Sequence, residues 1–293
     1  MTLFDTYSLL FRAFYALPPM NTSSKVPTSA LYGLCSVVLK VLREQRSRAL
    51  AFAVDAPRRT FRHDRCAGYK AQRETAPPAL RSQIERLPEL LEAFEAPVFC
   101  APGFEADDVI ASLAPRLREG GEPVLIVSGD RDLLQLVADD VHVWFVGARG
   151  RDATLFDVRA VLDRFGVPPE RLPSWTALVG DPSDNLRGAE GVGPRIATRL
   201  IAEHGSVGAL LAHADVVSPL KIRESLKASA ERLLLNEELV RLRRDVPLGS
   251  GPFAAPLGTA AIARLERAFG QLEFRSLLPR LGALTTMAAK SAG

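Results

Sequence analysis

The sequence predicts an α/β protein whose mostly parallel sheet is covered by helices. Three short apolar runs are typical of buried strands, and each is followed closely by an acidic residue: 1–4, 50–54 and 124–127. Helical patterns lie between and after these runs, at 30–46, 106–117 and 133–137. Strands that alternate with helices favour a parallel sheet with helices on its faces, so this order indicates the fold class.

A basic, proline-interrupted connection follows the second strand, at residues 57–87. It contains eight arginine or lysine residues and three acidic ones, a surplus of +5. A connection of this length indicates a functional lid or binding element, although a crossover helix would explain part of it. After Val167 the strand signal disappears and helices dominate. We therefore expect a sheet-containing core at 1–166 and a helical region at 167–293 that ends in a frayed tail.

Composition places the 293-residue chain among ordinary globular proteins, because 47% of its residues are hydrophobic and 24% are charged. The longest early apolar stretch, 49–54, is far shorter than the roughly 20 residues of a membrane span, and no basic head of a secretory signal is present. Three cysteines without C-x-x-C spacing argue against a disulfide framework or a zinc knuckle. We expect a cytoplasmic protein, and a monomer by default.

Nine acidic residues follow the predicted strands or open the predicted helices: Asp5, Asp55, Glu105, Asp107, Asp108, Asp130, Asp132, Asp181 and Asp184. Single residues of this kind are often only helix caps. Side chains at the carboxyl ends of parallel strands meet in one place, so we expect the nine to converge. Their repulsion would raise several pKa values unless cations bind, and hard oxygen ligands favour Mg²⁺ or Mn²⁺ over zinc.

The charge balance indicates a polyanionic substrate. Removing the nine carboxylates from 34 acidic residues leaves 25 against 37 basic ones, so the rest of the chain carries +12. Two metal ions about 3.5 to 4 Å apart would support hydrolysis of a phosphodiester bond. A serine or cysteine nucleophile is poorly supported, because the four histidines have no partner motif, and no Walker loop is present.

A glycine-rich turn precedes the helical pattern that begins at Pro194. Gly191 and Gly193 would let a nucleic-acid backbone approach, and the free amides at the helix start would bind its phosphate. Arg195 and Arg199 add positive charge. Alone, this pattern is most often a simple turn, but together with the acidic residues it indicates a duplex anchor.

Taken together, these motifs resemble the 5′ nucleases of the flap endonuclease type, especially the 5′-3′ exonuclease domain of bacterial DNA polymerase I. The resemblance covers nearly the whole chain and lies in these segments: 3–5, 10–14, 60–63, 69–73, 103–109, 128–133, 178–185 and 191–193. It implies a PIN-like sheet, a helical arch at 57–87, and a helix-three-turn-helix (helix-hairpin-helix) at about 170–212 that grips duplex DNA beside a K⁺ ion. Thr6 departs from the glycine usual after the first acid.

The resemblance also implies roles for single residues. One metal group is Asp5, Asp55, Glu105, Asp107 and Asp108, and the second is Asp130, Asp132, Asp181 and Asp184. Lys70 and Arg81 would contact the scissile phosphate or steer the flap. Tyr69 would stack on a base or, nearly as well, pack under the arch. The other expected DNA contacts are Arg73, Gly191, Gly193, Arg195 and Arg199.

The sequence thus predicts a free-standing, structure-selective 5′-3′ exonuclease and 5′-flap endonuclease that acts in primer removal and repair. Its substrate would be flapped or 5′-ended duplex DNA, with an RNA primer in a hybrid left open. Two alternatives remain at this point. One is a catalytically silent DNA-binding protein on the same scaffold, and the other is a PIN-type ribonuclease.

Overall fold

The computed structural model describes residues 1–47, 49–57, 59–119, 121–147 and 153–291, and contains a six-stranded sheet of order β3-β2-β1-β4-β5-β6. The first five strands pair in parallel, and the last is antiparallel at the edge. The strands are β1 Thr2–Asp5, β2 Leu50–Ala53, β3 Val98–Phe99, β4 Val124–Ser128, β5 Val141–Val146 and β6 Ala153–Phe156. The predicted α/β class is therefore confirmed, with β3, β5 and β6 added to the predicted strands.

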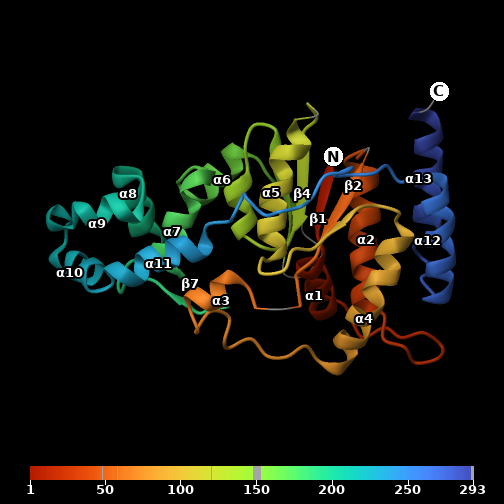
Figure 1. The fold of residues 1–293 in the computed structure, drawn as a ribbon, viewed down its shortest axis with the longest axis horizontal. Helices are drawn as coiled ribbons and strands as arrows, with labels where there is room; N and C mark the ends of the chain where they lie inside the picture. The colour runs from red at the N-terminus through yellow and green to blue at the C-terminus, as the bar shows by residue number, and fades with distance from the viewer. Residues whose placement is uncertain (48, 58, 120, 148–152, 292–293) are drawn as a thin grey trace.

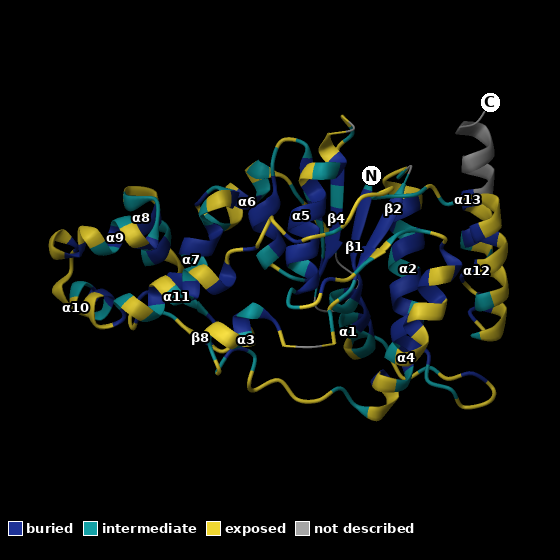
Figure 2. Ribbon diagram, in the orientation of Figure 1, coloured by how far each residue is buried: buried dark blue, intermediate teal, exposed yellow. Residues whose placement is uncertain are grey.

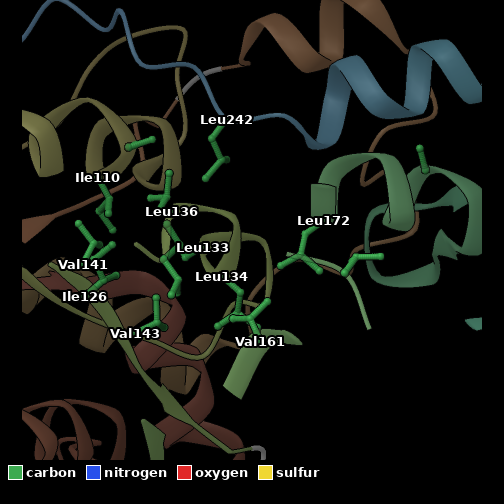
Figure 3. Packing of buried hydrophobic residues seen from close by; sticks show 14 of the residues in the cluster. Ile110, Ile126, Leu133, Leu134, Leu136, Val141, Val143, Val161, Leu172 and Leu242 are labelled. Atoms are coloured by element: carbon green, nitrogen blue, oxygen red, sulfur yellow. The ribbon is translucent and has the colours of Figure 1, made fainter. Parts of the chain in front are cut away.

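Alternate residues of each strand enter two separate hydrophobic clusters, one on each face of the sheet. Leu3 and Ile126 pack toward α5 (Ala106–Arg118) and the 3-10 helix η1 (Asp132–Leu136). Their neighbours Phe4 and Val127 pack toward the opposite helices. These helices are α1 Thr6–Ala16, α2 Ser29–Glu44, α4 Pro78–Ala93, α12 Thr259–Gln271 and α13 Leu278–Ser291. Figure 2 shows the sheet as buried, and Figure 3 shows the first cluster closely packed.

A second group of helices extends from one side of the sheet (Figure 1). It consists of α6 Val158–Phe165, α7 Leu172–Val179, α8 Pro194–His204, α9 Val207–Ala212, α10 Leu220–Ala228 and α11 Ala230–Val240. Between α7 and α8, the short strands β7 (Gly180–Asp181) and β8 (Leu186–Arg187) flank a 3-10 turn, Pro182–Asp184. Gly188 follows β8 and must be glycine, because a Cβ there would lie 2.3 Å from the Leu178 carbonyl oxygen.

Two expected boundaries differ in the structure. Of the described residues in the predicted connection, 57 and 59–77, with the short helix α3 (Phe61–Arg65), precede α4, and 78–87 belong to α4 itself. There, Leu80 and Leu87 are buried, and the Gln83 side chain accepts hydrogen bonds from the first amides of α2. Likewise, α12 and α13 do not extend the helical region of 167–293 but return to pack on α4 and α2. Among the described residues, no helix is both long and apolar enough to span a bilayer.

Candidate active site

Six of the nine predicted carboxylates line one cleft of about 620 Å³ at the carboxyl edge of the parallel strands, here called the acidic cleft. They come from the ends of β1, β2 and β4, the start of α5, and β7: Asp5, Asp55, Glu105, Asp107, Asp130 and Asp181. Lys70 and Arg73 line the same cleft. Asp132 lies in an adjoining cavity of about 150 Å³, which it shares with Asp181. The parallel strand order thus brings together residues that are remote in sequence.

Burial, and to a smaller extent the crowding of like charges, raises several pKa values in the acidic cleft. Burial raises the pKa of Asp5 to about 7, and the charges of Asp55 and Asp130 add to this rise, although a hydrogen bond from Ser128 opposes it. Burial, and then the nearby charge of Asp130, also raise the pKa of Asp107 and that of Asp132. Burial therefore disfavours the ionised form of these carboxylates, and a bound cation would stabilise that form.

Residues of the connection between α3 and α4 hold two of the carboxylates through direct contacts. Lys70 Nζ lies 3.0 Å from both oxygens of Glu105 and 3.9 Å from Asp184 Oδ2. Tyr69 Oη lies 3.1 Å from Glu105 Oε2 and 2.8 Å from Asp184 Oδ2, while Arg73 donates to Asp184 Oδ1 at 2.8 Å. Lys70 adopts a positive φ of 54°, a strained backbone conformation of the kind that clusters at functional sites.

The Tyr69 side chain is packed against neighbouring residues of the connection between β2 and α4. Its side chain is 3% exposed. The His63 ring meets it edge to face at 5.4 Å, and Lys70 Nζ lies 4.8 Å from its centroid. No face of the ring is open to a base in this arrangement, so the expected stacking role is wrong.

Asp108 was expected among the metal ligands, and the structure corrects this. Its side chain is fully buried, and each carboxylate oxygen already accepts two hydrogen bonds. Oδ1 accepts from Arg62 Nη2 at 2.8 Å and the Arg243 amide at 2.9 Å. Oδ2 accepts from Arg62 Nη1 at 2.5 Å and the Glu105 amide at 3.2 Å. With all of its lone pairs used, Asp108 joins α3, the start of α5 and the segment after α11, and it is not part of the lining of the acidic cleft.

The donor chemistry of the acidic cleft fits a hard divalent cation, because its wall carries carboxylates but neither histidine nor cysteine. Across the described residues, no three carboxylate, imidazole or thiol groups already surround a single point as a metal shell. Lys70, Arg73 and Arg131 supply the nearby positive charge in this conformation, the last at 3.8 Å from Asp181. The acidic cleft therefore suits a divalent cation because of its carboxylate oxygens and the repulsion between them.

Sequence reasoning missed a cationic and aromatic wall on α1. Tyr7, Phe11 and Tyr15 line the acidic cleft, and Tyr15 is 69% exposed. Arg12 donates to the Gly129 carbonyl and lies over Phe145 at 5.6 Å, while its Nε has no hydrogen-bond partner among the described residues. The signal was present in the sequence, since these aromatics recur every fourth residue directly after Asp5.

The remaining predicted residues lie outside the acidic cleft. Arg81 is on the exposed side of α4. Gly191 has a φ of 78° in the turn before α8, and Gly193 caps that helix. Arg195 is exposed in the first turn of α8, and Arg199 donates to the Ser218 carbonyl at 3.0 Å. Figure 1 shows α8 at the far side of the molecule from α1.

An acidic cleft at the strand ends, bordered by cations and joined to a helical region with a glycine turn, defines the class of nucleases that hydrolyse phosphodiester bonds. The chain belongs to the 5′-3′ exonuclease family. Residues 1–166 match its N-terminal resolvase-like domain, and residues 167–259 match its C-terminal SAM fold. The predicted family, and the PIN-like core with a helical region, are thereby confirmed.

Two relatives define the extent of the match. The 5′-3′ exonuclease of Aquifex aeolicus is 35% identical over 286 residues, 98% of this chain and 96% of that protein. DNA polymerase I of Mycobacterium tuberculosis is 42% identical over 283 residues, 96% of this chain. The chain spans 31% of the polymerase's length.

Solved structures share the fold. The T5 5′-exonuclease with bound divalent metal ions (zinc) matches with a TM-score of 0.67 and 27% identity, over 82% of this chain and 88% of that one. The catalytic core of Rad2, solved with a DNA substrate, matches with a TM-score of 0.61 and 16% identity, over 95% of this chain and 91% of that one. The Rad2 likeness is one of fold.

Proposed function

We propose that this chain is a divalent-metal-dependent, structure-selective 5′ nuclease that cleaves 5′-flap or 5′-ended duplex DNA and leaves 5′-phosphate and 3′-hydroxyl ends. The observation that carries the proposal is the acidic cleft, where carboxylates from five segments meet beside Lys70 and Arg73. An acidic site within a basic chain suits a polyanion whose backbone is held by cations. The T5 relative with bound zinc ions supports the dependence on divalent metal.

Mg²⁺ is the proposed ion, with Mn²⁺ as a substitute. One ion would be held by Asp5, Asp55, Glu105 and Asp107, and the other by Asp130, Asp132, Asp181 and Asp184. Two such ions, when bound, would supply an activated water and would stabilise the leaving oxygen of an in-line displacement.

Basic and aromatic side chains would hold the DNA around this centre. Lys70 lines the acidic cleft and is held there by Glu105, and its charge would act on the scissile phosphate. Arg12 and Arg73 border the same space. The exposed ring of Tyr15 offers a stacking surface to bases of the single strand, worth about 1 to 3 kcal/mol per base. Arg81, beyond the arch, would steer the flap.

The helical region would anchor the duplex. The turn with Gly191 and Gly193 presents backbone groups to a phosphate and to a K⁺ ion, while Arg195 and Arg199 add charge beside it. Residues 57–77 would form the arch, within a core at 1–166 and a DNA-binding region that starts at 167. In the cell we propose primer removal and repair, by a cytoplasmic monomer, with an RNA primer in a hybrid as a further substrate.

Cleavage mapping on a labelled double-flap DNA, with and without Mg²⁺, tests the proposal. We expect cleavage near the base of the 5′ flap that requires Mg²⁺, and its loss in Asp107→Ala/Asp130→Ala. Asp139→Ala, on an exposed turn before β5, is the matched control and should retain activity. Undiminished cleavage by the double variant would overturn the proposal. DNA binding without cleavage would indicate a silent binding protein, and cleavage of RNA alone would indicate a ribonuclease.

A further inference from the structure

Two serine hydroxyls, one in the lining of the acidic cleft (Ser8) and one behind it (Ser128), connect the two carboxylate groups. Ser128 ends β4, and the parallel register pairs Phe4 of β1 with Val127, so the next residues, Asp5 and Ser128, also lie side by side. Ser128 is completely buried. Its Oγ donates to Asp5 Oδ2 at 2.5 Å and accepts from the Asp130 amide at 2.8 Å. One hydroxyl therefore contacts a carboxylate of the first group and the backbone of the second.

Ser8, in the first turn of α1, completes the connection. Its Oγ accepts from the Gly129 amide at 3.1 Å and lies 3.5 Å from Ser128 Oγ. Its amide donates to Asp5 Oδ1 at 3.4 Å. Both oxygens of Asp5 and two successive amides of the loop after β4 are thus fixed by the same pair of serines.

We propose that Ser128, supported by Ser8, is a positioning residue that holds Asp5 and the Asp130 loop at the spacing required by a divalent cation. The inference rests on the proposed function, in which these carboxylates bind metal. Without this link, two repelling carboxylates on separate strand ends would have to be ordered when the metal binds, and affinity would fall. Groups that orient metal ligands through hydrogen bonds typically contribute 10- to 100-fold to metal affinity.

Ser112 provides a matched control for the loss of a buried hydroxyl. It is also buried, its Oγ donates to the Arg243 carbonyl at 3.4 Å, and it accepts from the Val246 amide at 3.1 Å. It lies on α5, outside the lining of the acidic cleft. A purely structural role for Ser128 predicts equal consequences for the two serines, whereas a positioning role predicts different ones.

The experiment measures Mn²⁺ dissociation constants of the whole chain without DNA, by electron paramagnetic resonance of free Mn²⁺. Ser128→Ala should weaken Mn²⁺ binding about 10- to 100-fold. Ser8→Ala should weaken it less, Ser128→Thr should restore most of the affinity, and Ser112→Ala should leave it unchanged. DNA affinity in chelator should be the same in all four variants. Ser8→Ala keeps the test decisive if Ser128→Ala does not fold, because Ser8 is only partly buried.

The inference would be overturned if Ser128→Ala bound Mn²⁺ as tightly as the wild-type protein. If only Ser8→Ala folds, wild-type affinity in that variant would overturn it. An equal loss of affinity in Ser112→Ala would also overturn it. Asp130→Ala separates this failure from that of the proposed function. If Asp130→Ala loses Mn²⁺ binding while both serine variants keep it, only the positioning role fails. If Asp130→Ala also binds Mn²⁺ normally, the proposed metal site itself is wrong.

Discussion

The acidic cleft and the turn before α8 present their functional groups in opposite ways. Around the cleft, the carboxylates are largely buried and bonded to neighbouring side chains, as in the contacts of Glu105 and Asp184 with Tyr69 and Lys70. In the turn before α8, a Cβ at Gly193 would meet nothing within 4 Å, and Arg195 is exposed. The groups of the cleft are held in place by one another, as the proposed chemistry would require, while the space beside Gly193 would admit the proposed DNA backbone.

This difference predicts two kinds of mutational effect. Changes around the cleft should alter folding, pH dependence or turnover, because each group there supports others. Changes at the turn should alter DNA affinity alone. The following predictions run from the largest expected effect to the smallest.

Asp108→Ala should lower the free energy of unfolding by about 3 to 5 kcal/mol, because it leaves the buried guanidinium of Arg62 without its partner. Urea denaturation measures this. Asp64→Ala, which breaks an exposed pair with Arg59, is the control and should change stability by less than about 0.5 kcal/mol. A stable Asp108→Ala variant that had lost metal binding would restore Asp108 to the ligand set.

Asp5→Asn should stabilise the metal-free protein in a pH-dependent way. Burial raises the folded-state pKa of Asp5 from 3.8 to about 7. Between these two values the unfolded chain ionises Asp5 while the folded chain keeps it protonated, so the wild-type protein loses stability as the pH rises. The advantage of the variant should therefore grow between about pH 4 and pH 7 and reach at most about 4 kcal/mol. Melting in chelator across this range measures it. An advantage that shrinks as the pH rises would contradict the burial of this carboxylate.

Lys70→Ala should lower kcat about 100-fold, because it removes a charge placed for the reacting phosphate. The dissociation constant for flap DNA should change little, and Lys70→Arg should recover part of the rate. Single-turnover cleavage and equilibrium binding separate the two effects. Weakened DNA binding with an unchanged rate would show that Lys70 contributes to DNA binding, as proposed for the turn before α8, and not to the chemical step.

Arg195→Ala should weaken duplex binding and reduce its salt slope by about 1, while the rate at saturating DNA stays the same. Gly193→Pro should weaken binding as well, since it removes an amide at the start of α8. Arg267→Ala, on the exposed side of α12, is the control and should leave the slope unchanged. Unchanged duplex binding in both Arg195→Ala and Gly193→Pro would show that the turn before α8 does not anchor the DNA duplex.

The sheet and the convergence of the acids were predictable because both depend on local signals. Apolar runs that end in acids mark the strands and their carboxyl ends, as with Phe4 before Asp5. Strand β5, Val141–Val146, was missed although its pattern of valines and aromatics is visible. The two-residue strand β3 is too short to leave a pattern.

The partners of individual carboxylates were not predictable, because they come from distant segments. Helical spacing puts Asp108 on the same face as Glu105, but only the fold reveals that Arg62, 46 residues earlier, already binds it. The same holds for Ser128 and Asp5, which become neighbours through strand register. The spacing of residues in the sequence indicates which side chains share a face of a helix. Tertiary contacts decide which of these side chains remain available to bind a ligand.

Crystals grown with Mn²⁺ and examined by anomalous diffraction test the proposed metal centre most directly. We expect two anomalous peaks about 3.5 to 4 Å apart in the acidic cleft, with Asp5, Glu105 and Asp107 toward one and Asp130 and Asp181 toward the other. Peaks confined to other surfaces, or a cleft filled only by Lys70 and Arg73 at saturating Mn²⁺, would contradict it.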